Sequence, residues 1–158
     1  MAEIDSDFYV HSSKIAGASP AIYCLVSLQV RCIYVGQTNS KLGVLGRFAQ
    51  HLSNSESNTF KQRVFSIYKY EDIELENIRG TYFCLPRENR FLNNATDYRD
   101  AVEALTQDKI IPVAASMGMS VISRVQKNPQ CSLDDIKLLS EIAAKKFEGF
   151  IRKQQSAD

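Results

Sequence analysis

Residues 21–40, AIYCLVSLQVRCIYVGQTNS, decide the fold of this chain. Two runs in it are rich in β-branched and aromatic residues, AIYCLVSL at 21–28 and CIYV at 32–35, and each run predicts a strand. The short polar bridge around residues 29–31 predicts that the two strands form an antiparallel hairpin. Gly36 and the polar residues after it are expected to break the strand pattern.

The chain after this hairpin alternates between helical and extended patterns. Five further elements are expected: a helix at 44–52, a helix at 57–68, an acidic surface loop at 71–76, a strand at 78–85 and a helix at 97–108. Pro86 ends the strand, Thr96 or Asp97 can cap the last helix, and Pro112 closes off that region. The fold class is therefore α+β, with a small three-stranded antiparallel sheet flanked by helices.

A long C-terminal helix is expected from Ser132 to Gln154. Ser132 with Asp135 three positions later resembles a capping box, and the apolar residues beyond keep helical spacing. Residues 132–158 carry five acids and five bases, so this helix is predicted to pack or to dimerise. The chain is expected to be a single domain, 1–158, with a lead-in segment at 1–19, a core at 20–110 and a C-terminal helical extension at 111–158.

Composition excludes several classes of protein. The 158 residues are 44% hydrophobic with a net charge of +1, which is enough for one ordinary core and argues against disorder. No apolar run approaches the ~20 residues that span a bilayer, and the polar, acidic N-terminus lacks a signal-peptide pattern, so a cytoplasmic protein without membrane contact is expected. The four cysteines form no C-x-x-C pair and are interpreted as small, partly buried apolar residues rather than a zinc or redox site.

The charge is distributed unevenly along the chain. Residues 31–63 contain five basic residues against one acid, a local net charge of +4. Such a stretch can form a phosphate-binding face, but lysines and arginines on solvated helices give the same count. The charge alone leaves both interpretations open.

A set of polar and aromatic residues is spaced as one site would need. AIY at 21–23 and YVG at 34–36 place two tyrosines on neighbouring strands, and Gln-Thr-Asn follows at 37–39. Arg47 and His51 are separated by four positions, which puts them on the same face of a helix. Glu103 lies in the middle of the later helix. Taken together and in this order, these residues resemble the GIY-YIG nuclease superfamily.

The resemblance implies a metal-dependent hydrolase of phosphodiester bonds. Tyr23 would be the general base toward water, assisted by His51 or Tyr34. Glu103 would hold a single Mg²⁺ or Mn²⁺, and Arg47 would stabilise the phosphate in the transition state. Contacts to phosphate or DNA fall on three polar residues after the second strand: Gln37, Asn39 and Lys41.

The sequence departs from the family pattern at three points. Ala21 replaces the first glycine, and the interval between Gly36 and Arg47 is longer than usual, which marks 40–46 as an inserted loop. The asparagine expected after the glutamate helix has no clear counterpart, since residues 112–127 contain none and Asn128 lies 25 positions beyond the candidate glutamate.

The leading functional hypothesis is an endonuclease that cuts double-stranded DNA. No appended DNA-binding module is visible, which favours a restriction-type enzyme, and palindromic sites would suit a homodimer formed through the C-terminal helix. Two alternatives stay open: a catalytically inactive nucleic-acid-binding module of the same fold, and an RNA-processing nuclease. Glu88 is a rival to Glu103 as the catalytic acid.

Overall fold

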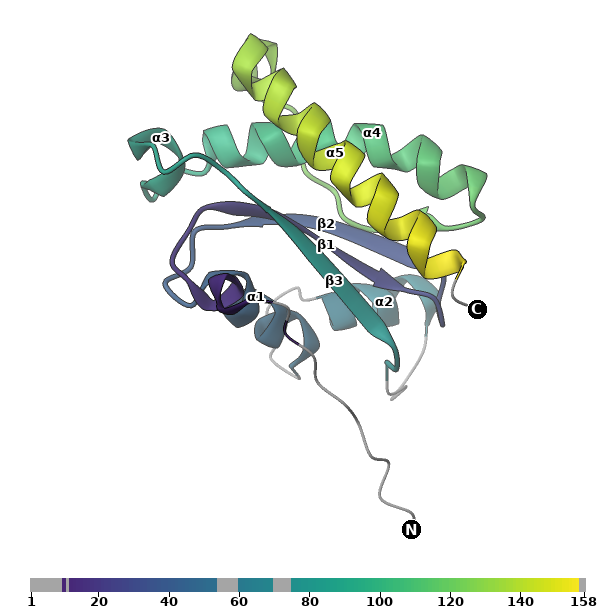
Figure 1. Cartoon of the computed structure of the whole chain (residues 1–158). Helices are drawn as coiled ribbons and strands as arrows, with labels where there is room; N and C mark the ends of the chain where they lie inside the picture. Colours follow the sequence, from purple (N-terminus) through teal and green to yellow (C-terminus); the bar gives the residue numbers. More distant parts are fainter. Residues whose placement is uncertain (1–9, 11, 54–59, 70–74, 157–158) are drawn as a thin grey trace.

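The protein, seen here as a computed structural model that describes residues 10, 12–53, 60–69 and 75–156, is built around one four-stranded sheet (Figure 1). The strands follow the order β3-β1-β2-β4. Their bounds are Ala21–Ser27 for β1, Cys32–Thr38 for β2, Ile78–Cys84 for β3 and Ser120–Val121 for β4. β1 pairs antiparallel with both β2 and β3, whereas β4 pairs in parallel with β2. The α+β class and the hairpin are confirmed, but the expected three-stranded antiparallel sheet is wrong, because two-residue β4 is too short to give a sequence pattern.

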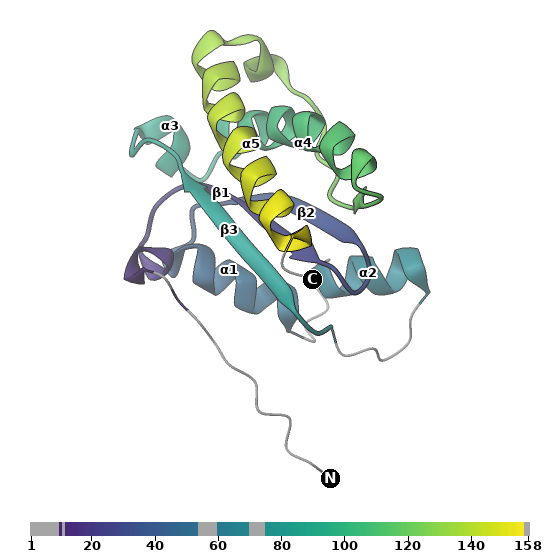
Figure 2. The same ribbon diagram turned by 45° about the vertical axis from the view of Figure 1, so that its right-hand side comes forward.

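Helices cover both faces of the sheet. The helical elements are η1 (Ser13–Ala16), α1 (Gly43–Leu52), α2 (Phe60–Tyr68), α3 (Asn89–Leu92), α4 (Asp97–Ser116), η2 (Pro129–Ser132) and α5 (Asp134–Gln155). α4 and α5 lie on one side of the sheet and α1 and α2 on the other (Figures 1 and 2). β1 is therefore buried at every position, which explains why its sequence is a continuous apolar run rather than an alternation.

The core is divided by the sheet into two apolar clusters. Ile22, Cys24 and Val26 of β1 belong to the cluster under α4 and α5, while Tyr23 and Leu25 belong to the cluster with α1 and α2. This alternation follows from the period of two along a strand. It directs the tyrosine of the AIY motif toward the α1 side.

Three helix ends differ from the expectation. Pro112 does not close the region, because it lies inside α4, which continues to Ser116. Proline removes the N–H that would bond to the carbonyl of Asp108, and Asp108 is exposed, so water can take that bond. The capping prediction for Ser132 is also wrong: its hydroxyl donates to the Pro129 carbonyl, and α5 begins two residues later without a side-chain cap. Thr96, likewise, makes no side-chain cap bond at the start of α4.

The segment between β2 and α1 is shorter than the expected inserted loop. β2 continues to Thr38, and α1 begins at Gly43, so the predicted loop at 40–46 includes the first turn of the helix. Gly43 has φ 60°, and a Cβ there would lie 2.5 Å from the carbonyl oxygens of Ile15 and Gly17. Glycine thus lets the lead-in segment pack against the start of α1.

Some expectations lie outside the described residues. These are the N-terminal part of the helix expected at 57–68 and most of the acidic loop at 71–76. The long C-terminal helix is confirmed as α5. Within the part of the chain that the structure describes, no helix combines the length and the apolar character that a membrane crossing needs.

Candidate active site

The hairpin places its two tyrosines together on the α1 side of the sheet. In the strand register Tyr23 lies opposite Gly36 and Leu25 opposite Tyr34, so both tyrosine rings emerge on one face. The rings are stacked with centroids 6.3 Å apart. A Cβ at Gly36 would collide with the Tyr23 ring, so the glycine of the YVG motif makes the space that this ring occupies.

α1 brings a cation and an imidazole to the Tyr23 hydroxyl. Arg47 Nε donates a hydrogen bond to the Tyr23 oxygen at 3.3 Å, and His51 Nε2 lies 2.5 Å from the same oxygen. His51 is 1% exposed, whereas Arg47 is half-buried and also donates through Nη1 to Gln50 Oε1. The four-residue spacing on the helix therefore aims both side chains at one phenol.

The backbone of α2 fixes which nitrogen of His51 carries the proton. The Phe60 N–H donates to His51 Nδ1 at 2.9 Å, so Nδ1 presents a lone pair. Burial, with the charges of Arg47 and Arg63 adding to it, lowers the pKa of His51 to about 4, so the ring is neutral near pH 7. Its single proton is then on Nε2 and is donated to the Tyr23 oxygen. His51 in this tautomer cannot take a proton from Tyr23, and instead joins Arg47 as a donor to it.

Both phenols are held in the neutral form by their surroundings. Burial raises the pKa of Tyr23 above its usual value, the neighbouring Tyr34 raises it further, and the charge and hydrogen bond of Arg47 lower it. Burial likewise raises the pKa of Tyr34, against the opposing charge of Arg63. The donors around Tyr23 thus favour its anion, while its burial disfavours that anion.

Glu103 lies on α4 and is close enough to this cluster for its charge to raise the pKa of Tyr23 and Tyr34. β4 pairs only with Cys32 and Ile33, and beyond that point the Val35 N–H donates to the Ser123 hydroxyl. The side chain of Gln37 joins the end of β2 to α4: its Nε2 donates to Asp100 Oδ1 at 3.1 Å, and its Oε1 accepts from Arg99 Nε at 2.8 Å. Glu103 lies one helical turn after Asp100.

The carboxyl of Glu103 has the character of a cation ligand. It is 9% exposed and accepts no hydrogen bond from the residues that the structure describes. Burial, with the charge of Asp100 adding to it and the charges of Arg47 and Arg63 opposing it, raises its pKa to about 8. A carboxylate oxygen on a largely buried side chain is a ligand type that a hard divalent ion accepts. Among the described residues no group of three or more His, Cys, Asp or Glu could hold a metal, so the fit is to one carboxylate and an ion that keeps most of its waters.

The three candidate phosphate contacts after β2 have other roles in this structure. Gln37 makes the bridge to α4 described above, and Asn39 Nδ2 donates to the carbonyls of Leu92 and Asn93, which lie before α4. Lys41 is exposed in the turn before α1. None of these observations brings the three side chains to the Tyr23 hydroxyl.

Two other residues raised by the sequence lie elsewhere. Glu88 pairs with Arg90 at 2.7 Å beside α3, with half of its side chain exposed, and so does not replace Glu103. Asn128 donates to the Asp97 carbonyl at the first residue of α4 and accepts from the Gln130 N–H. That position is six residues before Glu103 along α4, so Asn128 supports the helix start.

Sequence reasoning missed one residue of the cluster, Arg63 on α2. Its guanidinium carbon lies 5.6 Å from the centroid of the Tyr34 ring, and Nη1 donates to the Ile122 carbonyl at 3.3 Å. The sequence offered only its membership of the basic stretch 31–63, because no local motif relates α2 to the hairpin.

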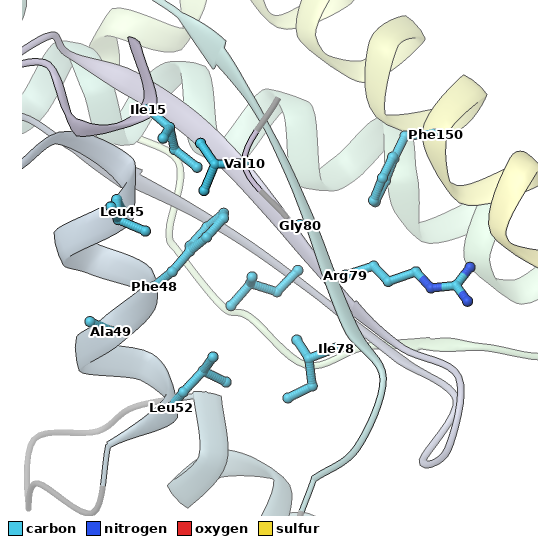
Figure 3. A pocket seen from close by; sticks show the side chains of 11 residues that line it. Val10, Ile15, Leu45, Phe48, Ala49, Leu52, Ile78, Arg79, Gly80 and Phe150 are labelled. Carbon is cyan, nitrogen blue, oxygen red and sulfur yellow. The ribbon is translucent and has the colours of Figure 1, made fainter. Parts of the chain in front are cut away.

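A cavity of about 740 Å³ lies next to this cluster but has a different character. It is bounded by α1 and β3 and is lined by apolar side chains such as Leu45, Phe48, Leu52 and Ile78 (Figure 3). Phe48 packs edge-on against Tyr23 with centroids 5.6 Å apart, so one ring separates the apolar cavity from the polar cluster. The cavity contains none of the groups that could move a proton or hold an anion at Tyr23.

Comparisons with known proteins give no relative for this chain. No protein-family model matches it, and neither a curated protein nor a solved structure does. The protein is therefore classified by its architecture, as an α+β domain with a cluster of polar and aromatic side chains. β1 and β2 contribute the tyrosines, α1 and α2 contribute the arginines and the histidine, and α4 contributes the glutamate.

Proposed function

We propose that this protein is a metal-dependent endonuclease that hydrolyses phosphodiester bonds of double-stranded DNA, in the manner of the GIY-YIG nucleases that its motifs resemble. The observation that carries the proposal is that Arg47 and His51 both contact the Tyr23 oxygen. Glu103, from the opposite helical layer, is close enough to raise the pKa of Tyr23. A hydrolase of phosphodiesters needs such a set: a proton acceptor, a phosphate clamp and a hard anionic ligand.

The reacting group in this proposal is the anion of Tyr23. Its oxygen takes a proton from the attacking water as the water oxygen bonds to phosphorus and the P–O bond to the leaving sugar oxygen breaks. The leaving oxygen takes a proton from solvent water, and Tyr23 is left as a neutral phenol. His51 Nε2–H and Arg47 Nε–H, both donors to this oxygen, stabilise the anion before the transfer. Since burial raises the pKa of Tyr23, the reactive fraction increases with pH and activity should rise toward the alkaline side.

In this proposal Arg47 and a cation held by Glu103 stabilise the negative charge on the phosphate. Arg47 has five N–H donors, and within the described residues only two of them are used, by Tyr23 and Gln50. The remaining donors suit a phosphate oxygen. Glu103 would hold Mg²⁺ or Mn²⁺, which when bound neutralises charge on the phosphoryl and leaving oxygens.

A homodimer is part of the restriction-type form of this proposal. Leu138 and Ile142 are 57% and 46% exposed and lie one turn apart on α5. An apolar pair on the surface of an otherwise amphipathic helix supports self-association through α5, and a two-fold dimer would suit a palindromic site.

One observation favours the alternative of an inactive nucleic-acid-binding module. Tyr23 is 0% exposed, so water reaches its oxygen only after a neighbouring side chain moves. In that alternative the arginines bind a phosphate backbone and no bond is cut. An RNA-processing nuclease uses the same groups and differs only in its substrate.

The deciding experiment is a plasmid-nicking assay with Mg²⁺. Wild type should convert supercoiled DNA to open circles, Glu103→Ala should lose this activity, and Glu88→Ala should retain it because Glu88 lies outside the cluster. Excess EDTA should stop the reaction. Wild-type protein that binds the plasmid without nicking it, with Mg²⁺ or Mn²⁺, would contradict the nuclease proposal and favour the inactive module. Duplex RNA in place of the plasmid separates the RNA alternative.

A further inference from the structure

Arg63 has a hydrogen-bonding group that the fold leaves unused. Its Nε is buried and has no partner among the described residues. An unsatisfied buried donor costs about 1–3 kcal/mol, and more when it is charged, so such a group in a folded protein calls for an explanation. Within the described residues this side chain makes one hydrogen bond, from Nη1 to the Ile122 carbonyl, and that bond is long at 3.3 Å.

The surroundings of Arg63 are those of the candidate active site. The guanidinium lies against the Tyr34 ring, and Tyr34 stacks on Tyr23. Its charge is strong enough at Tyr34, His51 and Glu103 to shift the titration of all three. The two arginines therefore flank the tyrosine pair, Arg47 beside Tyr23 and Arg63 beside Tyr34.

A second unsatisfied atom belongs to the same region. Gln107, one helical turn beyond Glu103 on α4, has a buried Oε1 without a partner in the described part of the chain. An unused donor on α2 and an unused acceptor on α4 are thus both present among the described residues.

We propose that Arg63 binds a second phosphate of the nucleic-acid backbone, next to the phosphate that Arg47 contacts. The inference rests on the proposed function for the identity of the ligand, but it concerns binding and does not need the bond to be cut. Arg63 is half-buried, and its Nη groups make only the long bond to the Ile122 carbonyl among the described residues, so an Nη donor can reach a phosphate oxygen while the ring of Tyr34 holds the guanidinium plane. Two cations on either side of the tyrosines would hold the strand across the site.

The test compares the salt dependence of DNA binding in variants. A labelled DNA duplex is titrated by fluorescence anisotropy at several salt concentrations in EDTA, with wild type, Arg63→Gln, Arg63→Lys and Arg79→Gln. Arg79 is the matched control because it is half-buried, donates to Gln154 Oε1, and points toward α5 and away from α1 (Figure 3). Each lost phosphate contact should reduce the slope of log K against log salt by about 0.9.

We expect the slope to fall by about one for Arg63→Gln and to stay at the wild-type value for Arg63→Lys and Arg79→Gln. A wild-type slope in folded Arg63→Gln would overturn the proposal. A second measurement compares wild type with Arg63→Gln on duplexes in which one backbone phosphate at a time is a neutral methylphosphonate. At least one position adjacent to the bound phosphate should weaken binding, and that loss should disappear in Arg63→Gln. If no single methylphosphonate substitution weakens DNA binding by wild type, Arg63 does not bind a backbone phosphate.

These results are separable from those of the nicking assay. Wild type that binds with the expected slopes but never nicks DNA would remove the nuclease proposal and leave the role of Arg63 intact. If wild type nicks DNA and Arg63→Gln keeps the wild-type salt dependence of binding, the nuclease proposal stands and the role of Arg63 is removed.

Discussion

Replacing Glu103 by glutamine should stabilise the folded protein, and by more as the pH rises. Burial raises the pKa of Glu103 from an ordinary 4.5 to about 8. The folded state thus holds this proton more tightly than the unfolded state, so the stability it contributes is complete below pH 4.5 and is lost as the pH rises to about 8. At about 1.4 kcal/mol per pH unit, the full difference is roughly 5 kcal/mol. Glutamine keeps the shape of the side chain and carries no charge to bury.

The assay is urea unfolding followed by circular dichroism at pH 5, 7 and 9, with EDTA present. The gain of Glu103→Gln over wild type should be small at pH 5 and reach several kcal/mol at pH 9. At pH 9 added Mg²⁺ should stabilise wild type by mass action and leave Glu103→Gln unchanged. A difference between Glu103→Gln and wild type that is equal at pH 5 and pH 9 would refute the argument.

Three further predictions address the geometry at the tyrosine. Gly36→Ala should destabilise the protein by about 1–3 kcal/mol in urea unfolding because the new methyl meets the Tyr23 ring, whereas Gly149→Ala, where nothing lies within 4 Å, should gain about 0.5–1 kcal/mol. Nitrogen NMR of His51 should show a neutral ring protonated at Nε2 throughout pH 5.5–8, and a proton on Nδ1 would contradict the assigned direction of its bond to the tyrosine. In the nicking assay Tyr23→Phe should reduce the rate ~10²–10³-fold and leave the salt dependence of DNA binding unchanged, and normal cutting by this variant would remove the tyrosine from the mechanism. Arg47→Lys should restore little of the activity that Arg47→Ala loses.

The sequence predicted those parts of the site that depend on local geometry. Tyr23 and Tyr34 belong to one hairpin, whose register is set by a short turn, so their proximity follows from strand alternation. Arg47 and His51 share a helix face because of their spacing alone. Glu103 was placed by analogy with a family pattern, and no periodicity in the chain could have brought α4 to the edge of β2.

What the sequence did not predict depends on contacts between distant segments. β4 exists because the chain returns after α4 to pair with Cys32 and Ile33, a match of two residues that no pattern reveals. Arg63 reaches Tyr34 only because α2 packs beside α1. Pro112 was interpreted as a helix end, but solvent at the exposed Asp108 carbonyl lets α4 continue past it. Each error concerns what surrounds a residue rather than the residue itself.

The electrostatic state of the free site explains why phosphate and cation should bind together. With a pKa of about 8, Glu103 is mostly protonated at pH 7, and His51 is neutral, so Arg47 and Arg63 leave the cluster with excess positive charge. That charge attracts a phosphate, but a phosphate beside Glu103 disfavours the carboxylate, while a divalent cation favours it. The charge of the cation attracts the phosphate directly, so each ligand raises the affinity for the other, and by linkage the effect is reciprocal. Magnesium should tighten DNA binding by wild type more at pH 9, where Glu103 is already ionised and the cation adds its full charge, than at pH 7, where the cation must displace the Glu103 proton, and should have no such effect on Glu103→Gln. Equal tightening by Mg²⁺ in both proteins would show that the cation acts elsewhere.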